Sequence, residues 1–225
     1  MRTDPFGATS NDCSALLCHC GEDTRIAAIV KLGLSDRLRS ALDSPATELP
    51  LSGDFPELRA DAAIPAAVLI AITDRPNPGM ILTERHERMR THAGQIAFPG
   101  GRTEPGEEPV DAALRESFEE LALNRAAVEL VGTLGEYRTV SGYVITPVIG
   151  VIPPDLQLQP RQSEVAGWFE APLGYLLNPA NQRVEKTVFG GRERHYWVIE
   201  WEGNRIWGAT AAILINLARR LNWKR

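Results

Sequence analysis

Short apolar runs separated by turn-forming residues fill most of the chain from residue 66 onward. Residues 67–73 and 80–83 are two such runs on either side of the sequence DRPNPG, which predicts two strands joined by a turn. The same pattern predicts further strands at residues 94–98, 128–137 and 143–152, and a hairpin over residues 195–208 that turns at Gly203.

The apolar spacing changes to that of an α-helix in three segments. Residues 109–123 begin with Pro109, whose missing N–H costs nothing at the first helical position, and place Asp111 in the positive first turn. A short helix is predicted over residues 170–178, and an apolar helix with a basic last turn over residues 209–221. Predicted strands come before and after the helix at residues 109–123, and a helix ends the chain. This order predicts an α/β fold with a mixed sheet between helices.

The first 60 residues differ in pattern from the rest of the chain. We expect residues 1–60 to form an N-terminal extension that is flexible at its start, and residues 61–225 to form the folded domain. Ser35 is expected to cap a short helix over residues 35–44, ahead of a segment rich in Pro, Ser and Gly. Free thiols in a poorly ordered tail are preferred over a zinc site for Cys13, Cys18 and Cys20.

Charge and hydropathy narrow the range of partners. The chain has 225 residues, with 24 Lys or Arg against 29 Asp or Glu, so its net charge of −5 argues against a nucleic-acid partner. The longest apolar stretch, residues 62–73, is far shorter than the roughly 20 residues that cross a bilayer, so no membrane span is expected. The N-terminus lacks the apolar core of a secretory signal, and a cytoplasmic location is expected.

The helix predicted over residues 109–123 carries three carboxylates on one face. Glu116, Glu119 and Glu120 are neighbours at spacings i, i+3 and i+4, and like charges this close destabilise a bare helix by about 0.2–0.5 kcal/mol per pair. A solvated acidic face would tolerate this repulsion, whereas Mg²⁺ or Mn²⁺ would reverse its sign, because both ions prefer oxygen ligands. The opposite face is expected to be buried through Val110, Ala113, Leu114, Phe118 and Leu121.

The loop and helix together carry a family signature. The sequence GRTEPGEEPVDAALRESFEELAL resembles the Nudix box, G-x5-E-x7-R-E-U-x-E-E-x-G-U, at Gly101, Glu107, Arg115, Glu116, Glu119 and Glu120. Two positions depart from it. Ser117 replaces an apolar residue, and its hydroxyl is expected to bond the carbonyl of Ala113. Ala122 replaces a glycine, so the helix is expected to run on before it turns. The resemblance implies the Nudix fold, an α/β/α sandwich with a central mixed β-sheet.

The segment just before this box resembles one branch of the family. The sequence ILTERHERMRTHAGQIAFPGG resembles the extra motif of the coenzyme A diphosphatase branch, L-L-T-x-R-S-x3-R-x3-G-x3-F-P-G-G, with Ile81 and His86 as departures. Its two arginines are Arg85 and Arg90, and guanidinium groups suit the diphosphate and the 3′-phosphate of coenzyme A. Pairing of one or both arginines with nearby acids such as Glu84 or Glu87 is the alternative.

The resemblance implies a reaction and a set of metal ligands. It implies Mg²⁺- or Mn²⁺-dependent hydrolysis of coenzyme A or its thioesters, giving adenosine 3′,5′-bisphosphate and 4′-phosphopantetheine or its acyl form. Glu116 and Glu120 are the implied principal ligands, Glu119 helps to hold a further metal, and Gly101 contributes its carbonyl. Arg115 is implied to orient the carboxylates.

Other roles in this reaction stay open. Gly100 and Gly101 are expected to approach the substrate closely, because glycine leaves room for a ligand beside the backbone. Glu164 lies in a downstream segment that resembles the region before the closing helix of the family, where an acid supplies another metal ligand or a base. Glu116, Glu164 and water activated by the metal are the alternatives for the base.

Three alternative functions are less favoured by the sequence. A Nudix diphosphatase for ADP-ribose or dinucleoside polyphosphates is disfavoured by the upstream arginines. A non-enzymatic nucleotide sensor is disfavoured by the intact carboxylates, and an EF-hand calcium site by the missing D-x-[DN]-x-[DN]-G pattern. The expected partner is a small nucleotide of the coenzyme A type, and the sequence leaves open whether the chain forms a homodimer.

Overall fold

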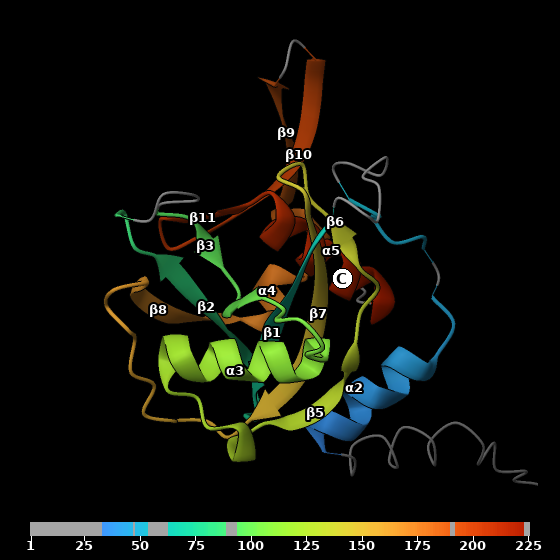
Figure 1. Cartoon of the computed structure of the whole chain (residues 1–225). Helices are drawn as coiled ribbons and strands as arrows, with labels where there is room; N and C mark the ends of the chain where they lie inside the picture. Colours follow the sequence, from blue (N-terminus) through green and yellow to red (C-terminus); the bar gives the residue numbers. More distant parts are fainter. Residues whose placement is uncertain (1–32, 47, 54–62, 89–93, 190–191, 223–225) are drawn as a thin grey trace, which may run out of the picture. The chain divides into compact units, whose positions relative to one another are not determined.

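The structure is a computed structural model that describes residues 33–46, 48–53, 63–88, 94–189 and 192–222 (Figure 1). Cys13, Cys18 and Cys20, which are predicted to be free thiols, therefore lie outside the described residues. Within the described part, no helix is long and apolar enough to cross a membrane.

Eight strands form the central sheet. Strand β1 pairs in parallel with β7 from Ile64 opposite Tyr143 to Thr73 opposite Ile152, whereas the other pairs of this sheet are antiparallel. The main path runs β3-β2-β1-β7-β5, with β4 beside β1, β6 beside β7 and β8 beside β2. The bounds are β1 (Ile64–Thr73), β2 (Gly79–Arg85), β3 (Ile96–Ala97), β4 (Gly100–Arg102), β5 (Glu129–Thr133), β6 (Tyr137–Arg138), β7 (Tyr143–Ile152) and β8 (Val165–Pro172).

A smaller antiparallel sheet and four α-helices complete the described part. The small sheet has the order β11-β10-β9, and its β9–β10 hairpin projects from the rest of the fold (Figure 1). These elements are β9 (Gln182–Phe189), β10 (Arg192–Trp201), β11 (Asn204–Trp207), α2 (Leu34–Asp43), α3 (Pro109–Leu121), α4 (Leu173–Leu176) and α5 (Ala209–Arg220), with short 3₁₀ turns at Arg125–Ala127 and Pro179–Asn181.

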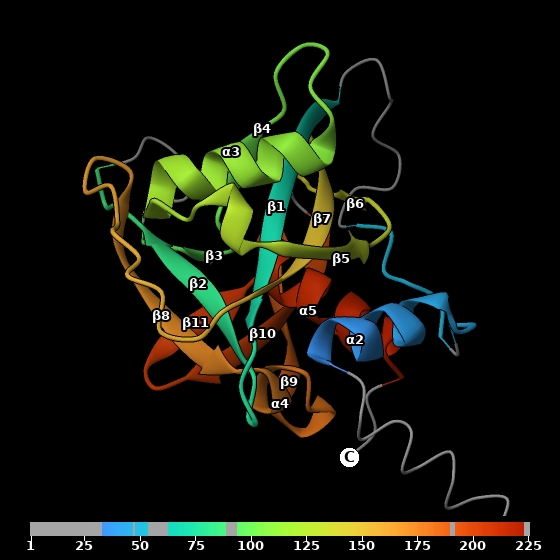
Figure 2. The same cartoon turned by 90° about the horizontal axis from the view of Figure 1, so that it is seen from below.

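The central strand β1 is buried on both faces, which explains its nearly continuous apolar sequence. Leu69 and Ala71 point into a core cluster beneath α3, while Ile70 and Ile72 point into a second cluster shared with α5. Figure 2 shows α3 on one side of β1 and β7, with α2 and α5 on the other. The predicted α/β fold, with a mixed sheet between helices, is confirmed.

Most predicted elements are present, with differences that have physical reasons. The strand predicted over residues 128–137 is divided into β5 and β6, and β4 forms within the predicted glycine-rich loop because it pairs with β1. Strands β8 and β9 were not predicted. Strand β9 has the sequence QRVEKTVF, in which charged residues on an exposed hairpin hide the apolar alternation. The short helix α4 begins only at Leu173, because β8 takes the residues before it.

Helix α3 differs from the prediction in two places. Phe118 is 58% exposed, so its predicted burial is wrong; the buried side of α3 is centred on Ser117, which is fully buried. The Ser117 hydroxyl donates to the Ala113 carbonyl at 2.6 Å, as predicted. Ala122 adopts the left-handed conformation with φ of 55°, so the helix does not run on past it. Burial of Leu123, which is 2% exposed, offsets the cost of this turn.

Helix α2 packs onto the domain through Leu34 and Leu38, both buried in the core cluster that includes α5. The helix begins after Gly33, and Ser35 is buried, so the predicted cap at Ser35 is wrong. The segment after α2 is held by Asn216 of α5, which accepts from the Leu51 N–H at 2.7 Å and donates to the Leu51 carbonyl at 2.9 Å. The division at residue 60 stays a prediction.

We expect Leu38→Ala to lower the free energy of unfolding by about 2–4 kcal/mol, because it leaves a cavity in this core. Leu49→Ala is the matched control, since Leu49 is 87% exposed in the same part of the chain and should cost under about 0.5 kcal/mol. Urea unfolding of both variants measures the difference. Equal small effects would show that α2 does not contribute to the folded core.

Candidate active site

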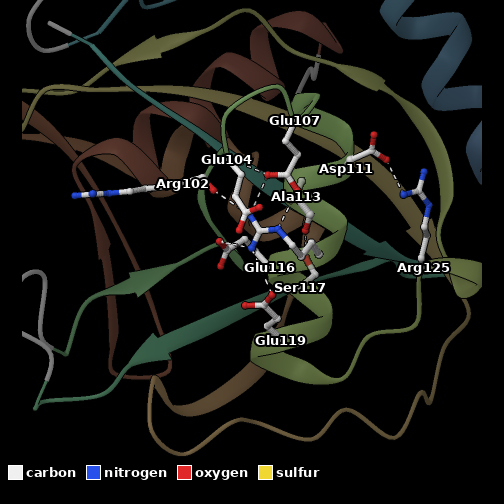
Figure 3. Close-up of polar contacts among 10 residues, drawn as sticks. Arg102, Glu104, Glu107, Asp111, Ala113, Glu116, Ser117, Glu119 and Arg125 are labelled. Atoms are coloured by element: carbon white, nitrogen blue, oxygen red, sulfur yellow. Dashed lines mark hydrogen bonds and ion pairs between the residues drawn. The ribbon is translucent and has the colours of Figure 1, made fainter.

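A single arginine joins the acidic face of α3 to the loop before it (Figure 3). Arg115 donates from Nε and Nη2 to the two carboxylate oxygens of Glu107 at 2.9 and 3.1 Å, and from Nη1 to Glu116 Oε1 at 2.9 Å. Its Nη2 also donates to the Arg102 carbonyl at 3.0 Å, and Nη1 lies 3.5 Å from Glu119 Oε1. The hydrogen bonds from Arg115 lower the pKa of Glu107, so this loop anchor stays ionised.

Two glycines of β4 let the strand lie against the acidic face. A Cβ at Gly101 would come within 2.4 Å of the Glu116 carboxyl carbon, and a Cβ at Gly100 within 2.4 Å of the Ala67 carbonyl oxygen. The Gly100 N–H donates to Glu120 Oε2 at 3.2 Å. The glycines are therefore required by close approach: one leaves room for a side chain, the other for the backbone of β1.

Glu120 is a carboxylate held in the interior. Only 5% of the residue is exposed, and this burial raises the pKa of Glu120 to about 7, despite the Gly100 N–H and the charge of Arg85. Burial also raises the pKa of Glu116, against the opposing effect of Arg115. The negative charge of Glu164 raises the pKa of both. The site thus concentrates negative charge where water does not screen it.

Two neighbouring segments complete the site. Arg85, at the end of β2, pairs with Val165 in β8, and the Glu164 carbonyl accepts from the N–H of His86 at 2.9 Å. In the described residues no ion pair joins Arg85 to Glu84 or Glu87, and the Arg85 Nε is buried without a hydrogen-bond partner. The second predicted arginine, Arg90, lies outside the described residues.

The donor chemistry of this cluster fits a divalent cation. Carboxylate oxygens are the ligands that Mg²⁺ and Mn²⁺ prefer, and a cation would offset the burial that raises the pKa of Glu116 and Glu120. Among the described side chains, no three of His, Cys, Asp or Glu are gathered closely enough to hold one ion. Glu116 and Glu119 both face Arg115 Nη1, which keeps their oxygens turned toward the guanidinium.

The structure adds one residue that sequence reasoning missed. Arg161 lies in the loop between β7 and β8, and its Nη1 is 3.6 Å from Glu164 Oε1. The i, i+3 spacing of Arg161 and Glu164 was visible in the sequence, but only the backbone pairing of this loop with α3 brings both residues to the site.

Comparisons with known proteins identify the family. A family model described as the NUDIX domain matches residues 63–190. A protein of Shigella boydii named "Uncharacterized Nudix hydrolase NudL" is 42% identical over 160 residues, covering 71% of this chain and 83% of that protein. The protein of the same name from Escherichia coli K12 is 41% identical over the same shares. A solved MutT protein from Methanosarcina mazei is 16% identical, with a TM-score of 0.48 over 72% of this chain and 96% of that one.

The match covers more than half of the chain and includes the acidic helix. The chain therefore belongs to the Nudix hydrolase family.

Glu120→Gln should stabilise the metal-free protein at pH 8 but not at pH 5. Because the pKa of Glu120 is raised from 4.5 to about 7 on folding, wild-type stability is lost as the pH rises between these values. The full difference at pH 8 is on the order of 3 kcal/mol. Thermal unfolding in chelator measures it, with Glu119→Gln as the control, since the Glu119 side chain is 40% exposed. A Glu120→Gln effect independent of pH would contradict the burial argument.

Alanine substitutions at the two glycines of β4 should have different effects, one on stability and the other on activity. Gly100→Ala is expected to cost about 1–3 kcal/mol of stability, because its Cβ meets the backbone of β1. Gly101→Ala should stay folded but lose hydrolytic activity, since the flexible Glu116 side chain must move away. Gly167→Ala is the control, because a Cβ there meets nothing within 4 Å. Urea unfolding and an activity assay are compared; full activity in Gly101→Ala would overturn this reading.

Proposed function

We propose that this Nudix hydrolase cleaves the diphosphate of coenzyme A or acyl-coenzyme A with Mg²⁺ or Mn²⁺. The products would be adenosine 3′,5′-bisphosphate and 4′-phosphopantetheine or its acyl form. One observation supports the proposal: besides burial, the charge of Arg85 lowers the pKa of Glu120 while the charges of Glu116 and Glu164 raise it, so a guanidinium and three carboxylates lie near one another.

In this proposal the carboxylates of α3 hold the metal. Glu116 and Glu120 are the principal ligands, with Glu119 for a further ion and the carbonyl of Gly101 as an additional donor. When bound, the cation neutralises the diphosphate and makes a bound water more acidic. Arg115 orients Glu116 through the 2.9 Å hydrogen bond to its Oε1.

Glu164 is the proposed base for the attacking water. Glu116 Oε1 already accepts a 2.9 Å hydrogen bond from Arg115, so this oxygen is engaged. Glu164 has a side chain that is 37% exposed and a looser contact, 3.6 Å, with Arg161. Its carboxylate is therefore the less engaged of the two and can reach a water molecule.

The motif before the Nudix box supports the choice of coenzyme A. Its residues form the hairpin of β2 and β3, in which Thr83 Oγ1 donates to the Ala97 carbonyl at 3.1 Å. Gly94, with φ of 67°, donates its N–H to the Arg85 carbonyl at 3.0 Å and closes the base of the loop. The charge of Arg85 acts on Glu120, and the buried Arg85 Nε has no hydrogen-bond partner among the described residues; both observations support Arg85 as a proposed phosphate ligand. Arg90 is the second proposed phosphate ligand, and Gly100 and Gly101 leave room for the substrate.

The deciding experiment is hydrolysis of coenzyme A with excess Mg²⁺ or Mn²⁺, followed by mass identification of the products. We expect adenosine 3′,5′-bisphosphate and phosphopantetheine. Glu116→Gln and Glu120→Gln should each lower kcat at least about a hundredfold while staying folded. Glu108→Gln, an exposed change just before α3, should leave kcat unaltered.

Comparison of coenzyme A with dephospho-coenzyme A and ADP-ribose tests the substrate itself. A site built for the 3′-phosphate should give the highest kcat/KM with coenzyme A. Turnover of ADP-ribose alone would refute the coenzyme A assignment but keep the Nudix chemistry. Near wild-type turnover by both Glu variants would refute the proposed ligands.

A further inference from the structure

We infer that Arg161 binds a phosphate group of the substrate, exchanging its loose contact with Glu164 for phosphate oxygens. This role rests on the proposed function, because it assigns a further residue to the same site. Arg161 is not part of either motif found in the sequence, and it lies in the loop between β7 and β8, where its side chain contacts Glu164.

The backbone of this loop is fixed to the end of α3. The Arg161 N–H donates to the Glu120 carbonyl at 2.8 Å, and the Gln159 N–H donates to the Leu121 carbonyl at 2.8 Å. Both carbonyls lie in the last turn of the helix, where no helical partner is available to them. Figure 1 shows this loop passing the end of α3 that precedes β5. The main chain at Arg161 is therefore attached directly to a residue of the acidic cluster.

The carbonyl of Arg161 fixes the position further. It accepts from the N–H groups of Glu164 and Val165 at 2.9 and 3.0 Å, forming a tight turn that leads into β8. Val165 is paired with Arg85, so the turn also sets Arg161 close to the other cationic residue of the site. The main chain of Arg161 is thus anchored on both its N–H and its carbonyl.

The side chain of Arg161, by contrast, makes few contacts. It is 56% exposed, and in the described part of the chain its one ion pair is the 3.6 Å contact with Glu164. Arg115, which holds the loop against α3, differs from Arg161. Its side chain is only 27% exposed and makes several hydrogen bonds at about 3 Å. An anchored backbone with free guanidinium donors suits a residue that meets its partner only when substrate is bound.

Charge favours the exchange. Glu164 lies in a cluster of carboxylates that also contains Glu116 and Glu120, and a nucleotide diphosphate brings further negative charge to it. A guanidinium can bind two phosphate oxygens at once, and such charge-assisted pairs are stronger than a loose contact with one carboxylate. Release of Glu164 from Arg161 would also leave that carboxylate free to act as the proposed base.

The test compares Arg161→Gln and Arg161→Lys with wild type in two measurements: KM for coenzyme A, and the affinity for inorganic pyrophosphate with Mg²⁺ by titration calorimetry. Arg161→Gln should raise KM and the pyrophosphate Kd by about tenfold to a hundredfold, with little change in kcat or Tm. Arg161→Lys, which keeps the charge but not the fork, should show a smaller increase. Arg125→Gln is the matched control, since Arg125 is a 63% exposed arginine paired with Asp111.

Unchanged KM and unchanged pyrophosphate affinity in Arg161→Gln would overturn the inference. A fall in kcat or Tm with unaltered KM would also overturn it, because it would show that Arg161 only positions Glu164 or supports the loop. If the wild-type protein does not hydrolyse coenzyme A, the proposed function fails by itself. The pyrophosphate titration then still decides the role of Arg161.

Discussion

The arrangement of the site depends on one guanidinium group. Arg115 binds both oxygens of Glu107 from the loop, one oxygen of Glu116 from its own helix and the carbonyl of Arg102 from β4. A lysine could not replace it, because its single ammonium lacks the planar fork that reaches several acceptors in fixed directions. Arg115 thus fixes the loop after β4 against α3, while the pairing of β4 with β1 sets the close approach of Gly101 to Glu116.

The buried carboxylate of Glu120 in this site destabilises the metal-free fold. Glu120 is almost fully buried among other acids, and its raised pKa means that the ionised form is disfavoured in the metal-free protein. A cluster of this kind is hard to explain by packing alone, since an apolar residue would fill the position at lower cost. Two hydrogen bonds hold Glu120 in place. The Gly100 N–H donates to its carboxylate, and the Arg161 N–H donates to its main-chain carbonyl.

Much of this could be predicted from the sequence, because the information is local. Pro109 marks the start of α3, and the continuous apolar run of β1 indicates a strand buried on both faces. The spacing of the three glutamates gives their shared face directly. Tertiary context decides the rest. The burial of Ser117 in place of Phe118, and the left-handed turn at Ala122, depend on how α3 meets the sheet.

Long-range backbone pairing is the other part that sequence reasoning does not reach. The strand β4 exists because β1 offers it a partner, and its own sequence is typical of a loop. Arg161 is brought to Glu120 by a main-chain hydrogen bond between segments about 40 residues apart, which side-chain patterns do not encode.

The attachment of Ser44 and Leu51 to α5 has a consequence for the order in which the chain folds. Arg220 donates to the carbonyl of Ser44, 176 residues earlier, and Asn216 pairs with Leu51 across 165 residues. Ser44 and Leu51 are made long before α5, so their hydrogen bonds with Arg220 and Asn216 form only after α5 has been synthesised. Helix α2 has an earlier partner, because Arg39 donates to Glu129 and to the carbonyl of Leu130 in β5. Of the described elements that hold this segment, α5 is therefore the last to attach.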